Sequence, residues 1–413
     1  MKYMVAGIDV HKRMLAVVVA EAKVGEMEFE RRRFQTTRSG LMELAQWLKE
    51  REVKEAVMES TAQYWRPVWL ALEQTCKLQL AQARSNGARR GRKSDFRDAE
   101  RMVQRLISGD LVLSFVPEEE QRGWRFLART RYTLVRERGR VQSHIEGLLE
   151  DAQIKLSSKI KDLLGVSGRR ILQALAEHKE GPLDVVGLAA LGDPQLQATP
   201  EELQDALNGR WLPRHGLLLS LHLERIQILD RQIDELYTKL GEAMKAHQQA
   251  IARVSEVPGF GPDSAMQVIA ELGPQAAVFP TPGQLASWIG VCPGQQESAG
   301  HSSSDQSPKG NRTMRRILDQ AAWAAVKKKG SFFQALYRRM LARSGEQQTI
   351  WAVAHRLCRL LWKILHEGVR YIEQGTPIVN VQTMNRRQRR LTAEFRKLGF
   401  QVTFTPIAQP VKG

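Results

Sequence analysis

The chain has 413 residues, of which 62 are Lys or Arg and 45 are Asp or Glu, so its formal net charge at pH 7 is +17. A hydrophobic content of 42% is enough for the buried cores of two or three domains. No apolar run is long enough to span a bilayer, which argues against a membrane protein. The charge predicts a polyanionic partner, with nucleic acid as the first candidate and an anionic membrane surface as the second.

The cysteines and histidines bear on the compartment. Cys76, Cys292 and Cys358 are far apart and match neither a zinc spacing nor a disulfide framework. The nine histidines form no His/Cys cluster, so we expect no transition-metal site. The N-terminus has no signal-peptide pattern. These features predict a cytoplasmic protein in a reducing environment.

The N-terminal hundred residues alternate between short apolar stretches and amphipathic ones. We expect strands at residues 4–9, 14–20, 28–35, 55–58 and 77–81, and helices at 39–50 and 64–74. Three strands followed by alternating helices and strands predict an α/β domain with a mixed sheet.

Four acidic residues follow the ends of these strands. Asp9 ends the first strand, Glu59 follows the fourth, and Asp95 and Asp98 open a helix after the fifth. Reacting groups in open α/β sheets lie at the carboxyl ends of strands, so this acidic quartet is expected to converge. A divalent cation would relieve the cost of an unpaired charge after a buried strand. The alternative is that Asp95 and Asp98 only mark a solvated helix start.

Basic residues surround the last two acids. Residues 84–105 contain eight of them, and we expect Arg92, Lys93 and Arg97 to bind nucleic-acid phosphates. Ser94 is expected to cap the helix that begins at Asp95. Carboxylates for a metal and cations for a backbone together suit a site that receives a phosphodiester.

Three segments carry a resemblance to a known family, namely Gly7–Lys12, Met58–Thr61 and Lys93–Ala99. They resemble the signatures of the DEDD transposases of the insertion-sequence 110 family, which includes the Piv-type invertases. The resemblance implies an RNase H/RuvC-like N-terminal domain whose acidic quartet holds one or two Mg²⁺ ions. It also implies a bacterial mobile genetic element and a nucleoid-associated enzyme.

The middle of the chain has two heptad patterns. Apolar residues recur every seven positions from Leu127 to Leu148 and from Leu219 to Leu240. The two helices would pack as an antiparallel pair within one chain or across subunits, and ordinary bundle helices are the alternative. The family places a coiled-coil insertion here, and its members act as multimers.

A glycine turn near residue 258 begins the next domain. Residues 254–273 predict two helices joined at Pro258–Pro262. In a helix-hairpin-helix turn, backbone amides grip a phosphate without reading sequence, so Gly259 and Gly261 are candidate nucleic-acid contacts. A plain helical hairpin is the alternative.

A polar loop rich in serine follows at residues 294–308, here called the serine loop. A serine among basic residues could attack a phosphodiester. The candidate phosphate contacts beside it are Lys309, Asn311, Arg312, Arg315 and Arg316. The composition alone also fits a flexible linker.

The family resemblance assigns the nucleophile to Ser298. Family members have serine directly before glycine, whereas Ala299 intervenes here. Ser302, Ser303 and Ser304 are therefore alternative nucleophiles.

These observations predict a three-part fold followed by a tail. We expect a RuvC-like catalytic domain at 1–115, a helical coiled-coil region at 116–249, a mainly α transposase domain at 250–375 and a basic tail at 376–413. The expected enzyme is a transposase or recombinase that cleaves and exchanges donor and target DNA with Mg²⁺. The resemblance implies a serine nucleophile, a homo-oligomer, and a structured guide RNA (bridge RNA). The alternatives are a metal-dependent nuclease or Holliday-junction resolvase that uses water, and a non-enzymatic nucleic-acid-binding protein.

Overall fold

The computed structural model describes residues 3–23, 27–59, 62–82, 94–179, 181–292, 297–298, 301–302, 307–373, 381–397, 401 and 403. The chain divides into two compact units, the first ending at Glu118 and the second beginning at Glu119, and each is described by itself. Within the described ranges, no helix combines the length and the apolar character needed to cross a membrane.

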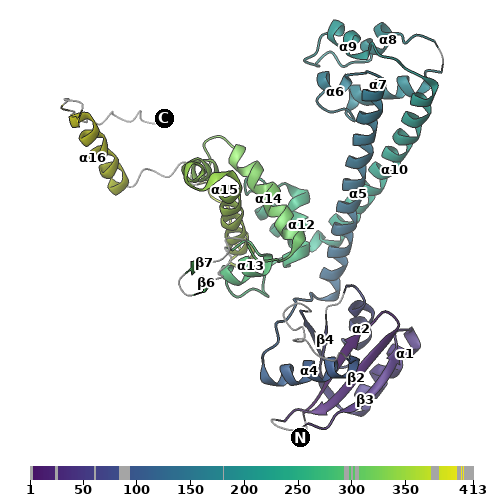
Figure 1. The fold of residues 1–413 in the computed structure, drawn as a ribbon, viewed down its shortest axis with the longest axis vertical. Helices are drawn as coiled ribbons and strands as arrows, with labels where there is room; N and C mark the ends of the chain where they lie inside the picture. Colours follow the sequence, from purple (N-terminus) through teal and green to yellow (C-terminus); the bar gives the residue numbers. More distant parts are fainter. Residues whose placement is uncertain are drawn as a thin grey trace. The chain divides into compact units, whose positions relative to one another are not determined.

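The first unit is built on a five-stranded mixed sheet (Figure 1). Its strands are β1 (Met4–Val10), β2 (Met14–Glu21), β3 (Glu30–Gln35), β4 (Val53–Glu59) and β5 (Lys77–Ala81), in the order β3-β2-β1-β4-β5. β1 and β2 pair antiparallel, as do β2 and β3, whereas β1, β4 and β5 run parallel. The sheet has the expected strands and the mixed pairing of an RNase H/RuvC-like domain, so the predicted fold class is confirmed.

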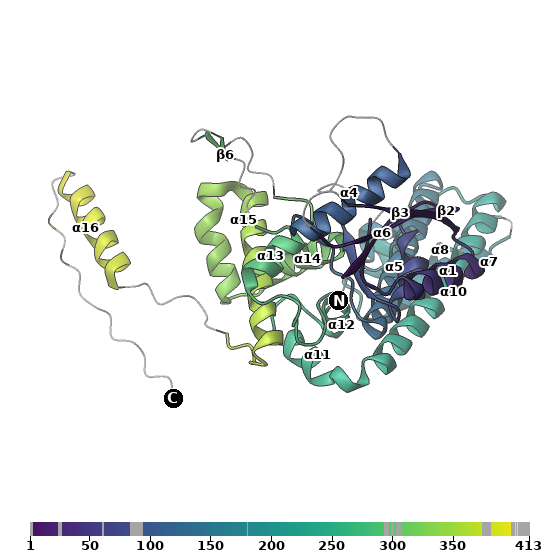
Figure 2. The ribbon, with the colours of Figure 1, turned by 90° about the horizontal axis from the view of Figure 1, so that it is seen from below.

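Helices cover both faces of this sheet. α1 (Arg38–Glu50) and α2 (Trp65–Leu72) pack on one face, and α4 (Asp95–Ser108) packs on the other (Figure 2). Side chains alternate along a strand, so Ala6 and Ile8 of β1 face α1 and α2, whereas Val5 faces α4. The same alternation directs Asp9 toward α4, because it lies an even number of residues from Val5.

Gly7 lets α4 approach the sheet closely. A Cβ atom at Gly7 would lie 2.3 Å from the carbonyl oxygen of Ala99 in α4, so only glycine fits this position of β1. Ala99 and Val103 of α4 are fully buried against the sheet, as their predicted apolar stripe requires. The prediction for Ser94 was wrong in one respect. Ser94 is the N-cap residue of α4, but its side chain makes no capping hydrogen bond.

The second unit begins with a long helical hairpin. α5 (Glu119–Asp151) and α10 (Pro213–Ala243) lie along one another in the same chain (Figure 1). The structure therefore favours the intrachain pair over a pairing across subunits. Asp230 of α10 joins this hairpin to α7 (Val166–Glu177), since Arg138 of α5 donates to Asp230 at 2.5 Å and Arg169 of α7 also pairs with it.

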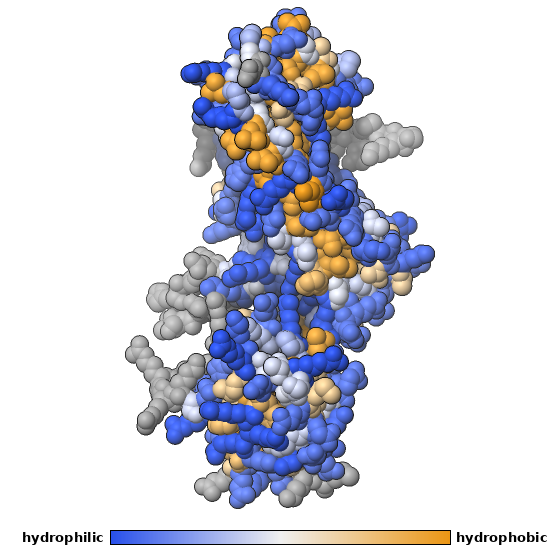
Figure 3. Space-filling model, turned by 90° about the vertical axis from the view of Figure 1, so that its right-hand side faces the viewer, coloured by the Kyte–Doolittle hydropathy of each residue, from blue (hydrophilic) through white to orange (hydrophobic). Residues whose placement is uncertain are grey.

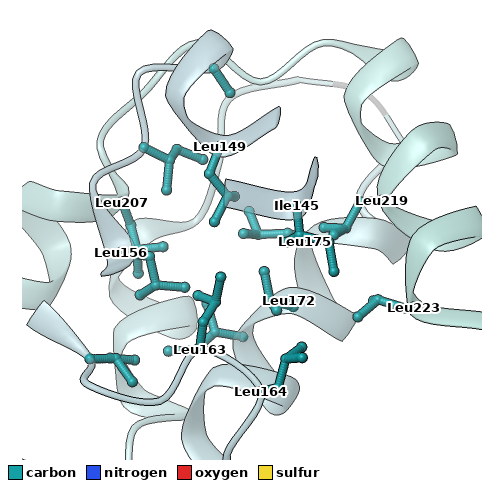
Figure 4. Packing of buried hydrophobic residues seen from close by; sticks show 14 of the residues in the cluster. Ile145, Leu149, Leu156, Leu163, Leu164, Leu172, Leu175, Leu207, Leu219 and Leu223 are labelled. Carbon is teal, nitrogen blue, oxygen red and sulfur yellow. The ribbon is translucent and has the colours of Figure 1, made fainter. Parts of the chain in front are cut away.

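Four short helices connect α5 to α10 at one end of the hairpin. They are α6 (Leu156–Lys159), α7 (Val166–Glu177), α8 (Val185–Ala190) and α9 (Pro200–Leu207). Their leucines meet those of α5 and α10 in one buried cluster, in which Ile145, Leu172 and Leu219 are fully buried (Figure 4). The connection is thus a small helical core of its own.

The rest of the second unit is almost wholly helical. Its elements are η1 (Lys245–His247), α11 (Gln248–Ser255), α12 (Pro262–Leu272), α13 (Pro282–Ile289), β6 (Glu297–Ser298), β7 (His301–Ser302), α14 (Arg312–Lys327), α15 (Phe332–His366) and α16 (Val381–Lys397). α11 and α12 form the predicted hairpin, and α15 is interrupted at Gly345, whose φ is 70°. The unit is mainly helical, as predicted for the C-terminal region.

The hairpin also leaves apolar residues in solvent. Leu217, Leu218 and Leu221 of α10 are 64%, 43% and 53% exposed. Figure 3 shows hydrophobic side chains gathered on the upper half of the face that it displays. Intrachain pairing of α5 and α10 therefore does not bury every apolar residue of α10.

Candidate functional site

An acidic cluster forms at the carboxyl end of β1. Asp9 is the sixth residue of β1, and His11 lies in the turn that follows it. Nε2 of His11 lies 3.0 Å from Oδ2 of Asp9 and 3.3 Å from Oδ1 of Asp95. One ligand atom from each of these three residues lies within 4.8 Å of the others. The first and third members of the acidic quartet are therefore brought together, with an imidazole between them.

The other two acids belong to the same end of the sheet. Asp98 lies one turn of α4 beyond Asp95 and acts electrostatically on Asp9. Its Oδ1 forms an ion pair with Nη2 of Arg101 at 3.0 Å. Glu59 ends β4, which runs parallel to β1 with Ile8 opposite Met58. Val57 packs with α4, so strand alternation directs Glu59 toward the same face as Asp9.

Asp9 is a partly buried carboxylate whose pKa is shifted by its surroundings. Burial raises its pKa above the ordinary value, the nearby charge of His11 lowers it, and the charges of Asp98 and Asp95 raise it again. The net effect is a raised pKa, because desolvation and like charges disfavour the ionised form. A divalent cation would reverse that balance, and carboxylate oxygens are the ligands that Mg²⁺ prefers. The donor set therefore fits a hard divalent ion.

His11 was not predicted as a site residue and appeared only within the segment Gly7–Lys12. Its position two residues after Asp9 was the available signal, since residues i and i+2 of an extended chain share a face. Arginines of β3 were missed too. Arg33 lies 3.9 Å from Asp95 and Arg31 lies 2.6 Å from Glu100. Of the predicted phosphate contacts here, Arg97 is exposed on α4, and Arg92 and Lys93 lie outside the described residues.

The glycine turn between α11 and α12 has two different glycines. Gly259 has a φ of 93°, and a Cβ there would lie 2.2 Å from the carbonyl oxygen of Ala321 in α14. Gly259 therefore serves close packing between helices. Gly261 is exposed with open space around its Cα, and its amide donates to Oγ of Ser264 at 2.9 Å. Gly261 is therefore the more accessible of the two, but its amide would have to leave the Ser264 hydroxyl before it could bind an external phosphate.

The serine loop contains a small antiparallel pairing. Ser298 of β6 is opposite His301 of β7, and Ser302 is opposite Glu297. The predicted nucleophile and one of its alternatives therefore lie on facing strands of one ribbon. Ser303 and Ser304 lie outside the described residues.

Arg315 fastens the base of this loop. Its guanidinium donates to the carbonyl oxygens of Gly290 and Pro308, the latter at 3.0 Å, and to Oγ of Ser307 at 3.2 Å. The ring centroid of Trp351 lies 4.5 Å from its Cζ, and Nε1 of Trp351 donates to the same Ser307 at 3.0 Å. Burial lowers the pKa of Arg315. These contacts make Arg315 a structural clamp.

Asn311 and Arg316 are also engaged within the protein. Asn311 caps α14 by accepting from Met314, and its Nδ2 donates to Glu271 at 2.9 Å. Arg316 donates to Gln267 at 2.8 Å and lies 3.5 Å above the ring of Tyr132.

Lys309 and Arg312 are exposed. Of the five residues predicted beside the serine loop, these two have the side chains most accessible to a phosphate.

Two family models match the chain. Residues 6–154 match a DEDD-type model described as "Transposase", and residues 251–338 match a model described as "Transposase IS116/IS110/IS902 family". The first covers the acidic cluster and the second covers the glycine turn and the serine loop.

The chain is similar to two bacterial proteins in sequence and to one solved structure. A putative transposase y4pF/y4sB of Sinorhizobium fredii is 25% identical over 317 residues, which are 75% of this chain and 71% of that protein. A probable family 20 transposase of Pseudomonas aeruginosa is 27% identical over 319 residues, which are 75% of this chain and 83% of that protein. The T. thermophilus RuvC structure with a Holliday junction substrate has 11% identity and a TM-score of 0.21, over 27% of this chain and 99% of that one.

Proposed function

Since this chain belongs to the IS110 family of transposases and is a DNA-processing enzyme, we propose that it cleaves and exchanges DNA strands with the acidic quartet and a serine nucleophile. The observation that carries the proposal is the convergence of Asp9, His11 and Asp95 at the carboxyl end of β1. A family defined by four acids implies a divalent metal, and this cluster offers the ligands for it.

The roles of the acids follow from their positions. Asp9, Asp95 and Asp98 would hold Mg²⁺ together with Glu59, which follows the adjacent parallel strand. When bound, the cation would supply charge stabilisation at the scissile phosphate and a lower pKa for the attacking hydroxyl. His11 would orient the Asp9 and Asp95 carboxylates, since one ring nitrogen contacts both.

Ser298 is proposed as the attacking group. Its oxygen would form the bond to phosphorus while a DNA oxygen leaves with a proton, so that a covalent protein–DNA intermediate conserves the bond for strand exchange. The clamp formed by Arg315 and Trp351 supports this role, because a nucleophile needs a loop with a fixed base. Water remains the alternative nucleophile, as in a nuclease or junction resolvase.

Two partners are part of the proposal. The net charge of +17 and the exposed Lys309 and Arg312 suit a second nucleic acid beside the DNA, and we propose a structured guide RNA. Exposed Leu217, Leu218 and Leu221 on α10 support a homo-oligomer, since contiguous exposed apolar residues mark interaction surfaces.

The test uses matched variants and the flanking DNA of the element. With Mg²⁺ and co-purified RNA, Asp98→Ala should abolish strand cleavage, whereas Asp110→Ala, just beyond the other end of α4, should cleave normally. Ser298→Ala should abolish a DNA adduct that survives denaturation, whereas changing the exposed Ser287 of α13 to Ala should not. Free cleavage products without any adduct would favour the water mechanism. Normal cleavage by Asp98→Ala would refute the catalytic role of the acidic quartet.

A further inference from the structure

A pocket of about 400 Å³ opens beside the acidic cluster. Its lining comes from three chain segments that follow β1, β3 and β4, and consists of His11, Lys12, Thr36, Gln63, Tyr64, Arg66 and Pro67. We call it the strand-end pocket. His11 belongs to both sites, because the ring that lines the pocket also contacts Asp9 and Asp95. A molecule in the pocket would therefore border the metal-binding carboxylates.

The pocket wall is held by hydrogen bonds within the protein. Thr36 donates from Oγ1 to the carbonyl oxygen of Lys12 at 2.9 Å, which fixes the turn after β1 against the end of β3. On the other side, the amide of Arg66 donates to the carbonyl oxygen of Gln63 at 3.2 Å at the start of α2. These bonds fix backbone and leave the outer ends of the longer side chains available to a ligand.

The side chains that face the pocket suit a nucleotide. Lys12 and Arg66 are exposed cations without an ion-pair partner in the part of the chain that the structure describes. Cations of this kind bind phosphate oxygens. Tyr64 lines the pocket and is 37% exposed, so it offers an aromatic ring for base stacking, and Gln63 offers an amide for a base edge. The volume falls within the range of small-ligand sites.

From this arrangement we infer that the strand-end pocket binds the nucleotide next to the scissile phosphate, with its base on Tyr64 and its phosphate between Lys12 and Arg66. The inference rests on the proposed strand cleavage and adds a subsite to it. The occupant is a nucleotide of the DNA strand, because the pocket adjoins the carboxylates that would act on that strand. An unpaired nucleotide is required, since a base inside a duplex cannot stack on a side chain.

The binding test uses the full chain and needs no cleavage. The probe is a single-stranded oligodeoxythymidylate in which 5-iodouracil replaces every second base, with Ca²⁺ in place of Mg²⁺. Irradiation should attach the probe to the peptide that contains Tyr64. Arg66→Ala should lower the yield and reduce the salt slope of binding at this site by about one. Lys54→Ala, an exposed cation at the opposite end of β4, should change neither.

A kinetic test complements it. Tyr64→Ala should raise the DNA concentration for half-maximal cleavage by about 5- to 150-fold, the usual effect of losing one base stack, and Tyr64→Phe should restore it. The idea fails if the crosslink maps elsewhere, if only an RNA probe attaches, or if Tyr64→Ala cleaves with unchanged half-saturation. Crosslinking of the probe requires no cleavage. If wild-type protein crosslinks the probe at Tyr64 but does not cleave DNA, the proposed function is refuted and the nucleotide-binding pocket is not.

Discussion

Removing the carboxylate of Glu271 should destabilise the second unit more than any surface change near it. Glu271 of α12 is 1% exposed and accepts two bonds from Arg129, at 2.8 and 2.9 Å, and one from Asn311. Arg125 adds an ion pair at 3.4 Å, and burial lowers the pKa of Arg125 to about 10, against the opposing charge of Glu271. In Glu271→Ala, a buried guanidinium would keep its desolvation cost without its counter-charge.

The expected loss follows from this geometry. Breaking a buried pair by removing one partner costs about 3–5 kcal/mol. At about 2–4 °C per kcal/mol for a sizeable domain, the unfolding midpoint should fall by about 6–20 °C. The matched control is Glu367→Ala, which removes the 43% exposed partner of the 58% exposed Lys363 and should cost about 0–1 kcal/mol. Thermal unfolding followed by circular dichroism measures both, and equal midpoints for the two variants would refute the reasoning.

Three further outcomes are expected. Gly7→Ala should push α4 from the sheet, lower the free energy of unfolding by about 1–3 kcal/mol and lower the cleavage rate at least about tenfold. Gly123→Ala, at a position with open space around it, should lower neither. Unchanged cleavage by Gly7→Ala would contradict the close contact. Burial raises the pKa of Asp230, but hydrogen bonds from Arg169 and Arg138 outweigh burial, so its pKa is lowered overall. The Asp230 carboxylate should therefore stabilise the fold above about pH 4, and this contribution should disappear as the pH falls further. Urea titrations of wild type and Asp230→Asn should therefore converge in acid, and a constant gap would count against this. Arg315→Lys should lose adduct formation more than overall stability, since lysine cannot span three acceptors; an unchanged adduct yield would exclude the clamp from catalysis.

Local patterns were enough to predict the first unit. Four of the five strands carry alternating or continuous apolar runs, whereas β3 has a single apolar residue, Phe34. Short connections leave few ways to pair the strands, so the sheet and the placement of Asp9 at a strand end could be predicted. Asp9 and Asp95 both follow strand ends, and such positions share one edge of the sheet, so their meeting was predicted as well. The orientation of His11 depended on side-chain contacts across the sheet edge, which no local pattern reports.

The basic residues show where sequence reasoning stopped. Arg97, Arg315 and Arg316 look alike in a sequence, and all three were expected to bind phosphate. Arg97 is exposed, whereas Arg315 and Arg316 are committed to carbonyl, amide and aromatic partners. The difference depends on contacts between distant residues, such as Arg315 with Trp351, and these appear only once the fold is formed.

The clamp at Arg315 has a consequence for how this loop can evolve. One guanidinium nitrogen contacts the carbonyl oxygens of both Gly290 and Pro308, so the two ends of the segment between them are held together at a single point. The entropy lost by such a closed segment grows only with the logarithm of its length, about 0.6 kcal/mol for each doubling. Insertions and deletions between these two anchors should therefore leave the stability of the surrounding helices almost untouched. Relatives would be free to vary the length of this segment and so the reach of whatever it carries, while Gly290, Pro308 and Arg315 hold its base unchanged.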